Sequence, residues 1–154
     1  TLALSLSIIL GLIYPLNLDS HELMARTDVG LDSVVLALAS GAAAVVSLTT
    51  GLASVLVGVM VAVALLPPTA TLGLMIGAGQ TKLAVGAALL LAVNIVSVNL
   101  AAKIVFWVRG VKPRSWLEKQ KANQSMVTYM VIWAVSLIAL LVVVFIRKGF
   151  LKVL

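Results

Sequence analysis

Long apolar runs separated by short polar segments dominate this chain. Apolar residues fill the ranges 2–14, 33–48, 52–79, 83–108 and 126–146 almost without interruption. A helix needs roughly 20 such residues to cross a bilayer, because each residue advances about 1.5 Å along the axis. The first run is too short to span, and we expect it to be the end of a helix that starts upstream. The pattern predicts an all-α fold, a polytopic transmembrane helix bundle.

Two adjacent prolines, Pro67 and Pro68, interrupt the third run where hydropathy alone would favour an unbroken helix. Each proline lacks an N–H and its ring clashes with the preceding turn, so the helix must kink or stop there. The carbonyls near Val63 and Ala64 then lose their donors. In hydrocarbon an unsatisfied backbone group costs several kcal/mol unless protein or a water-filled cavity takes it up. The break therefore either lines a site for a solute or serves helix packing alone.

The topology depends on whether residues 52–79 cross the membrane once or return as a re-entrant hairpin. The stretch is 28 residues long, which is about 42 Å if it is wholly helical. That length suits one tilted, proline-broken span slightly better than two short legs. Thr49-Thr50-Gly51, just before it, predicts a tight turn.

Small side chains recur along the second and third runs. Such residues let helix backbones approach closely, which in lipid replaces the missing hydrophobic drive for association. Packing is the main interpretation of this pattern, and close approach of a ligand is the alternative. The positions concerned are Gly41 in the second run, Ser54, Gly58 and Ala62 at four-residue intervals before the prolines, and Gly73 and Gly77 after them.

Polar side chains near the break are the candidates for binding. Asn94 and Ser97 share one face of the predicted helix 83–108, whereas Asn99 points elsewhere. Asn94 falls near mid-depth, where a buried amide either joins helices or coordinates a ligand. Thr69 and Thr71 follow the prolines, where either can cap a second half-helix and lend a hydroxyl to the site. Together with Pro67 and Pro68, these residues form the predicted ion or substrate site.

Two charged segments flank the spans. Residues 16–32 hold four of the five acidic residues and are expected to form an interfacial loop, with Glu22 and Arg26 spaced as an i,i+4 ion pair. A short amphipathic helix over 20–27 and a solvated loop are both open there. Residues 109–125 form a basic connector that the positive-inside rule places in the cytoplasm. The Lys and Arg counts on the two sides differ too little to fix the orientation.

Composition narrows the function further. The chain is 62% hydrophobic and only 10% charged, far outside the range of soluble domains. It has no cysteine and one histidine, so we expect no metal site and no cofactor. The net charge is +6, and the basic residues lie beside apolar spans, where we expect them to set the membrane topology. The expected partner of the chain is therefore the lipid bilayer and not nucleic acid. Because the chain has no initiator Met, we interpret 1–154 as the transmembrane domain of a longer protein.

A constellation of residues resembles a known family. It comprises Glu22-x-x-x-Arg26-Thr27, the small run from Ala37 to Ala43, Leu65-Leu66-Pro67-Pro68 with Gly58 before it, and then Gly73, Asn94, Phe106 and Gly110. Together these resemble the hydrophobic prokaryotic membrane family catalogued as a domain of unknown function, number 389. The resemblance implies a larger protein with a soluble region and further spans before this portion. It also implies a second proline motif in an earlier span, and it supplies no activity.

Three functions were compared on these grounds. The break and the polar face fit best with a channel or secondary transporter for an ion or small solute, a multi-pass protein of the cell membrane. We expect this protein to be a homo-oligomer. The alternative is a membrane anchor or a signalling or scaffold component whose activity lies in a missing soluble domain. An enzyme is not expected, because no span carries a histidine or carboxylate that can act as a base.

Overall fold

The computed structural model describes residues 2–14, 20–51, 54–110 and 116–153, and their side chains except those of 54, 56, 116–126 and 149–153. Helices and no strands make up this described part, as the all-α prediction required. In chain order they are α1 (Leu2–Ile13), α2 (His21–Ala25), α3 (Leu31–Thr49), α4 (Ser54–Gly77), α5 (Thr81–Val108) and α6 (Trp116–Val153). Four of them, α3 to α6, are long and apolar enough to cross a membrane.

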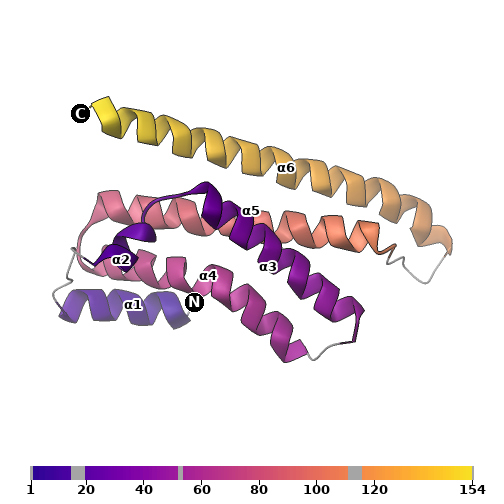
Figure 1. The fold of residues 1–154 in the computed structure, drawn as a ribbon, viewed down its shortest axis with the longest axis horizontal. Helices are drawn as coiled ribbons and strands as arrows, with labels where there is room; N and C mark the ends of the chain where they lie inside the picture. Colours follow the sequence, from indigo (N-terminus) through magenta and orange to yellow (C-terminus); the bar gives the residue numbers. More distant parts are fainter. Residues whose placement is uncertain (1, 15–19, 52–53, 111–115, 154) are drawn as a thin grey trace.

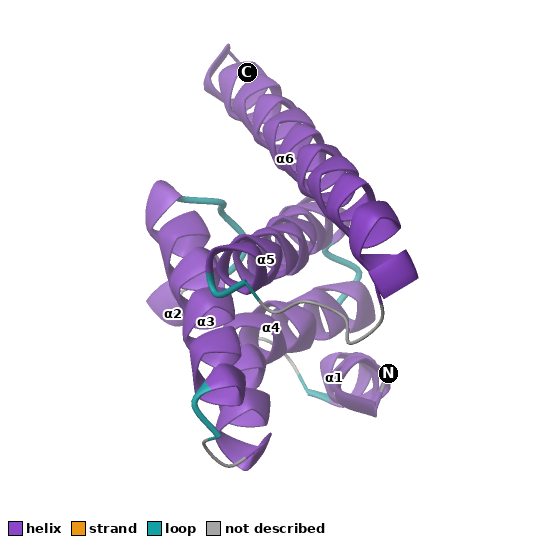
Figure 2. Ribbon diagram, turned by 90° about the vertical axis from the view of Figure 1, so that its right-hand side faces the viewer, coloured by secondary structure: helices purple, strands orange, loops and turns teal. Residues whose placement is uncertain are grey.

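Helix α5 is the centre of the bundle. It packs against α3, α4 and α6, while α1 packs against α4 (Figures 1 and 2). Of its span, 44% is buried inside the structure, against 11% of the α6 span. The outer helix α6 therefore exposes most of its apolar surface, which suits a helix that faces lipid.

Helix α4 runs through both prolines without ending. The 24 residues from Ser54 to Gly77 form one helix with Pro67 and Pro68 inside it, and the ribbon bends about midway along its length (Figure 1). A proline bends a helix because its ring displaces the preceding turn and one backbone bond is missing. The stretch is therefore a single bent span, the topology that its length favoured, and not a hairpin.

Sharp turns on both sides of α4 use glycines in the left-handed conformation. Helix α3 ends at Thr49, and Gly51 follows with φ 75°. Helix α4 ends at Gly77, and Gly79 has φ 70°. The turn predicted at Thr49-Thr50-Gly51 is confirmed.

The acidic segment contains the short helix α2, which is five residues long. Glu22 and Arg26 are both exposed, and in the described residues no ion pair joins them, so that prediction is wrong. Among the described side chains, an ion pair joins Asp28, in the α2–α3 connection, to Lys148 near the end of α6. The charge of Asp28 is therefore paired with a residue of α6, far away in the sequence, and not with a neighbour in its own segment.

Helix α6 begins inside the segment expected to be a basic connector. Its first residue is Trp116, and its membrane span Val127–Lys148 covers the predicted run 126–146 except for the first residue. Near the start of this span the ammonium of Lys103, on α5, lies 5.3 Å from the centre of the Tyr129 ring. This distance is within the range of a cation–π interaction, so the two helices are joined there by more than apolar contact.

Candidate functional site

The side chain of Asn94 closes the gap that Pro68 leaves in α4. In a regular helix the residue at position 68 donates its N–H to the carbonyl of Ala64, four residues earlier, and proline has no N–H to donate. Asn94 Nδ2, on α5, donates to this carbonyl at a distance of 2.8 Å. Asn94 is 7% exposed and Ala64 3%. The freed carbonyl and the polar amide of the neighbouring span, both predicted separately, therefore meet inside the bundle.

Two oxygen atoms beside this bond have no hydrogen-bond partner among the described residues. They are Asn94 Oδ1 and Ser97 Oγ, and both are fully buried. A separation of three residues places these side chains on one face of α5. Leaving a buried polar atom unpaired costs about 1–3 kcal/mol, so such atoms in native proteins usually have a water, an ion or a functional role. The amide oxygen can accept, and the hydroxyl can both donate and accept.

The face of α4 that contains the freed carbonyl is buried from Ala64 to Met75. Ala64, Pro68, Thr71 and Met75 follow at intervals of four, three and four residues, so they share one face, and all four are buried. Pro68 and Met75 are among the largest fully buried side chains of the described chain. No residue from 33 to 117 is an Asp or Glu. The polar atoms of Asn94 and Ser97 thus lie beside a buried and mostly apolar face, and residues 33–117 supply no carboxylate to them.

Thr69 does not have the capping role that was predicted for it. Its hydroxyl donates to the carbonyl of Leu65 at 2.7 Å, inside α4. Because the helix continues through this point, Thr69 does not begin a second half-helix, and α4 presents no free N–H groups to an anion there. Thr71 is 5% exposed and Pro67 is half-buried. The groups that remain for binding a ligand near the bend are therefore oxygen atoms, above all Asn94 Oδ1 and Ser97 Oγ.

Close helix contacts account for three of the predicted small positions. A Cβ at Gly41 would overlap the backbone of Val98 on α5. Cβ atoms at Gly73 and Gly77 would overlap α1, at Leu4 and Ser7 for the first and at Ile8 and Gly11 for the second. These glycines face neighbouring backbones, so no space for a ligand is left beside them.

The small positions before the prolines are different. Gly58 and Ala62 are exposed, and nothing lies within 4 Å of the place that a Cβ on Gly58 would take. The side chain of Ser54 lies outside the described residues. The packing predicted for Gly58 and Ala62 is therefore not realised among the described residues.

Sequence reasoning missed two further glycines. A Cβ on Gly11 would overlap Leu74 of α4, and one on Gly86 would overlap the carbonyl of Thr27. Gly86 lies in the small run Ala84-Val85-Gly86-Ala87-Ala88, a signal of the same kind as the one that pointed to Gly41. In the described residues no group of three or more His, Asp or Glu side chains is placed to hold a metal ion.

Four membrane-length apolar helices with α5 at their centre, and a polar contact at a proline bend, define an α-helical multi-pass membrane protein in a lipid bilayer. The chain belongs to the family described as a domain of unknown function (DUF389), whose sequence profile matches residues 1–100. The match begins at α1, earlier than the residues on which the resemblance was based. It includes both prolines, Asn94 and Ser97.

One relative is an uncharacterized protein of Methanocaldococcus jannaschii, which is 34% identical over 139 residues. The matched region is 90% of this chain and 43% of the relative, so the chain spans less than half of that protein. No solved structure matches the chain.

Proposed function

We propose that this chain is part of a channel or secondary transporter for an ion or small solute, in the cell membrane, and not of an enzyme. Asn94 Oδ1 and Ser97 Oγ bind the transported species beside the bend of α4. The observation that supports this proposal is the pair of buried oxygens without partners. Asn94 lies in the middle of the 28 residues of α5, so the pair is near mid-depth, where transporters commonly hold their substrates.

The chemistry of the site favours a monovalent cation or an uncharged polar solute. Divalent cations are usually held by carboxylates, and residues 33–117 contain none. An anion needs exposed N–H groups or basic side chains, and the continuous α4 offers no free N–H end beside Thr69. Neutral oxygens can replace part of the hydration shell of a small cation, as carbonyl oxygens do in ion channels.

The residues have separate tasks in this proposal. Pro67 and Pro68 remove two donors and bend α4, which frees carbonyls. The Asn94 amide nitrogen bonds the freed carbonyl of Ala64, and this bond fixes the direction of Oδ1. Ser97 supplies a second oxygen on the same face, and Thr71 is a third candidate from α4. Proton coupling through a carboxylate is not part of the proposal.

Flux through liposomes that contain the purified protein tests this function. Monovalent cations and small polar solutes are compared. We expect at least one to cross at a rate that Asn94→Ala or Ser97→Ala lowers about tenfold, because each removes about one hydrogen bond to a bound ligand. Pro67→Ala should also change this rate, because it changes the bend of α4. Asn99→Ala is the matched control, because the Asn99 amide on the same helix bonds its own backbone at Ile95. Equal flux in the Asn94 and Asn99 variants would remove the site, and no flux for any species would count against the class.

The alternative remains a membrane anchor or a signalling or scaffold component whose activity lies in a soluble domain. The bond from Asn94 to Ala64 supports it too, because interhelical hydrogen bonds also serve packing alone. The exposed Gly58 and Ala62 fit the expected homo-oligomer, in which a second copy covers them. In the anchor, Ser97→Ala and Asn94→Ala change stability only, so the flux comparison separates the two functions.

A further inference from the structure

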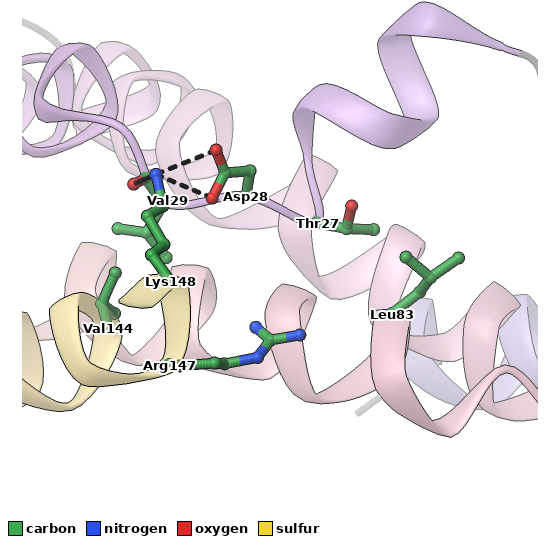
Figure 3. Close-up of a pocket in the computed structure, with 7 residues that line it drawn as sticks. All are labelled: Thr27, Asp28, Val29, Leu83, Val144, Arg147 and Lys148. Atoms are coloured by element: carbon green, nitrogen blue, oxygen red, sulfur yellow. Dashed lines mark hydrogen bonds and ion pairs between the residues drawn. The ribbon is translucent and has the colours of Figure 1, made fainter. Parts of the chain in front are cut away.

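A cavity of about 210 Å³ lies where the membrane span of α6 ends (Figure 3). Its lining comes from the α2–α3 connection, from the start of α5 and from α6, and comprises Thr27, Asp28, Val29, Leu83, Val144, Arg147 and Lys148. Pockets for drug-sized molecules are usually about 300–1,000 Å³. This cavity is smaller, so it suits a single polar group rather than a whole organic ligand.

One hydrogen bond holds the guanidinium of Arg147 at the edge of this cavity. Its Nη2 donates to the backbone carbonyl of Lys82, in the first turn of α5. Gly86 provides the room beside it, because a Cβ there would lie 3.0 Å from Arg147 Nη1 and would overlap Thr27. Figure 3 shows the guanidinium extending between Leu83 and α6. A guanidinium has five N–H donors, and the bond to Lys82 uses one of them.

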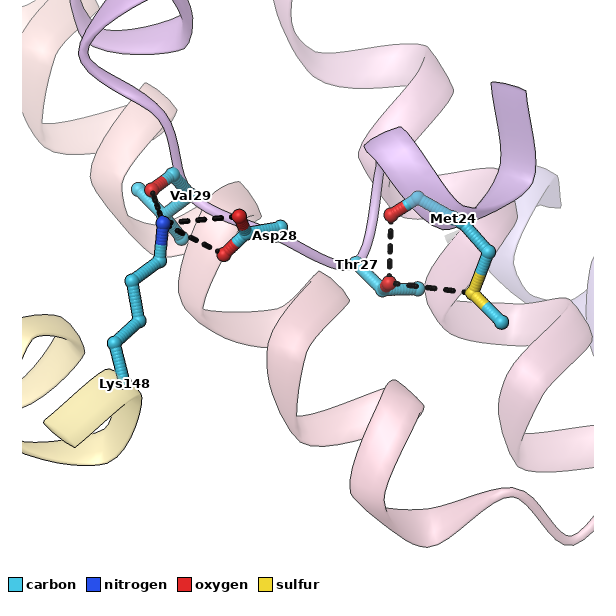
Figure 4. Close-up of polar contacts among 5 residues, drawn as sticks. All are labelled: Met24, Thr27, Asp28, Val29 and Lys148. Carbon is cyan, nitrogen blue, oxygen red and sulfur yellow. Dashed lines mark hydrogen bonds and ion pairs between the residues drawn. The ribbon is translucent and has the colours of Figure 1, made fainter. Parts of the chain in front are cut away.

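The second cation of the cavity is already neutralised. Lys148 Nζ lies 2.9 Å from both carboxylate oxygens of Asp28, and 2.9 Å from the carbonyl of Val29 (Figure 4). Thr27 turns its hydroxyl away, to the carbonyl of Met24 at 2.7 Å. The lining therefore has two cations and one carboxylate, which leaves the charge of Arg147 in excess.

Three membrane-length helices end at the cavity, which is the depth at which lipid headgroups lie when such helices span a bilayer. The α6 span ends at Lys148, α5 begins at Thr81 and α3 begins at Leu31, so three membrane helices reach their ends here. Three of its lining residues, Val29, Leu83 and Val144, are apolar, and Phe145, next to Val144 on α6, is 81% exposed. An occupant with a phosphate at this depth and an apolar chain below it matches both parts of the lining.

We infer that this cavity binds the phosphate group of an anionic phospholipid through Arg147. The guanidinium fork matches two phosphate oxygens, and basic pockets between membrane helices are typical sites for acidic headgroups. This inference does not depend on transport, because it uses neither Asn94 nor the proline bend.

Native mass spectrometry of the detergent-purified protein tests the inference with phosphatidylglycerol and phosphatidylcholine supplied together. Both lipids carry a phosphate, but only the first has net negative charge. We expect the protein to retain phosphatidylglycerol about fivefold more, the effect of one basic residue near an acidic headgroup. Arg147→Gln should remove the preference, whereas Arg147→Lys should keep part of it. Arg109→Gln is the control, because it removes an exposed arginine at the far end of α5.

Equal retention of the two lipids by the unmodified protein would overturn the inference without any variant, even if Arg147→Gln does not fold. Equal losses from Arg147→Gln and Arg109→Gln would also overturn it, since they would show a general charge effect. A third arm adds inorganic phosphate and follows thermal stability. If inorganic phosphate stabilises the protein as much as phosphatidylglycerol does, and Arg147→Gln abolishes this effect, the lipid is overturned as the occupant and free phosphate takes its place.

Discussion

The hydrogen bond from Asn94 to Ala64 should contribute to stability only while residue 68 is a proline. Pro68→Ala supplies a backbone N–H that can donate to the Ala64 carbonyl within α4, and the Asn94 amide is then no longer that carbonyl's only donor. The two substitutions, singly and together, form a double-mutant cycle. Loss of the buried proline ring and any change in the bend occur in both Pro68→Ala proteins, so to first order they cancel in the coupling energy.

The expected size follows from the geometry. Asn94→Ala removes a buried 2.8 Å bond and leaves the Ala64 carbonyl without a donor. Interhelical hydrogen bonds in membrane proteins contribute about 0.6–2 kcal/mol, and an unpaired buried polar group costs about 1–3 kcal/mol. We expect Asn94→Ala to lower the free energy of unfolding by about 1–2 kcal/mol in the natural background. In the Pro68→Ala background it should cost no more than about 0.5 kcal/mol, which gives a coupling of about 1 kcal/mol.

Reversible unfolding in mixed micelles, measured for all four proteins, gives the coupling directly. Asn99→Ala, tested in both backgrounds, is the control, because its amide bonds Ile95 on its own helix and is independent of position 68. An equal cost of Asn94→Ala in the two backgrounds would refute the reasoning. It would mean that the amide does not replace the N–H that Pro68 lacks.

Three further predictions concern other parts of the structure. Gly77→Leu should destabilise the protein by about 1–3 kcal/mol, since its side chain would overlap α1, whereas Gly58→Leu should shift the unfolding temperature of a single chain little because no described atom lies within 4 Å of the place that a Cβ would take there. Ser97→Ala should leave stability within about 0.5 kcal/mol, because the hydroxyl has no hydrogen-bond partner among the described residues, and a larger loss in micelle unfolding would show a hidden structural bond. Lys148→Met should cost less than about 1 kcal/mol, an effect that shrinks in high salt, because the pair with Asp28 is partly exposed.

Local patterns in the sequence predicted the spans, the bend and the tight turn at Gly51. Each follows from a few neighbouring residues: apolar run length, two prolines, and a glycine after a helix end. The sequence also indicated that a carbonyl near Ala64 would need a hydrogen-bond donor and that the polar side chain of Asn94 would lie near the middle of the membrane. It did not pair the two, because 30 residues separate them and only the packing of α4 on α5 brings them together.

The errors and omissions have the same origin. Glu22 and Arg26 have the spacing of a helical pair, but α2 ends at Ala25 and both side chains face solvent. Lys148 and Asp28 are 120 residues apart, so no local rule can join them. Thr69 was expected to cap a new half-helix, but the bent α4 keeps its hydrogen bonding past the prolines, and the hydroxyl bonds Leu65 instead.

The central claim is that the unpartnered oxygens of Asn94 and Ser97 hold something polar. A high-resolution experimental map of the protein in a lipid bilayer tests it most directly. We expect density for a water or a cation about 2.4–3.0 Å from both Asn94 Oδ1 and Ser97 Oγ. A map in which neighbouring side chains close over these two atoms, with no density between Pro68 and Asn94, would contradict the claim and leave the bend a feature of packing alone.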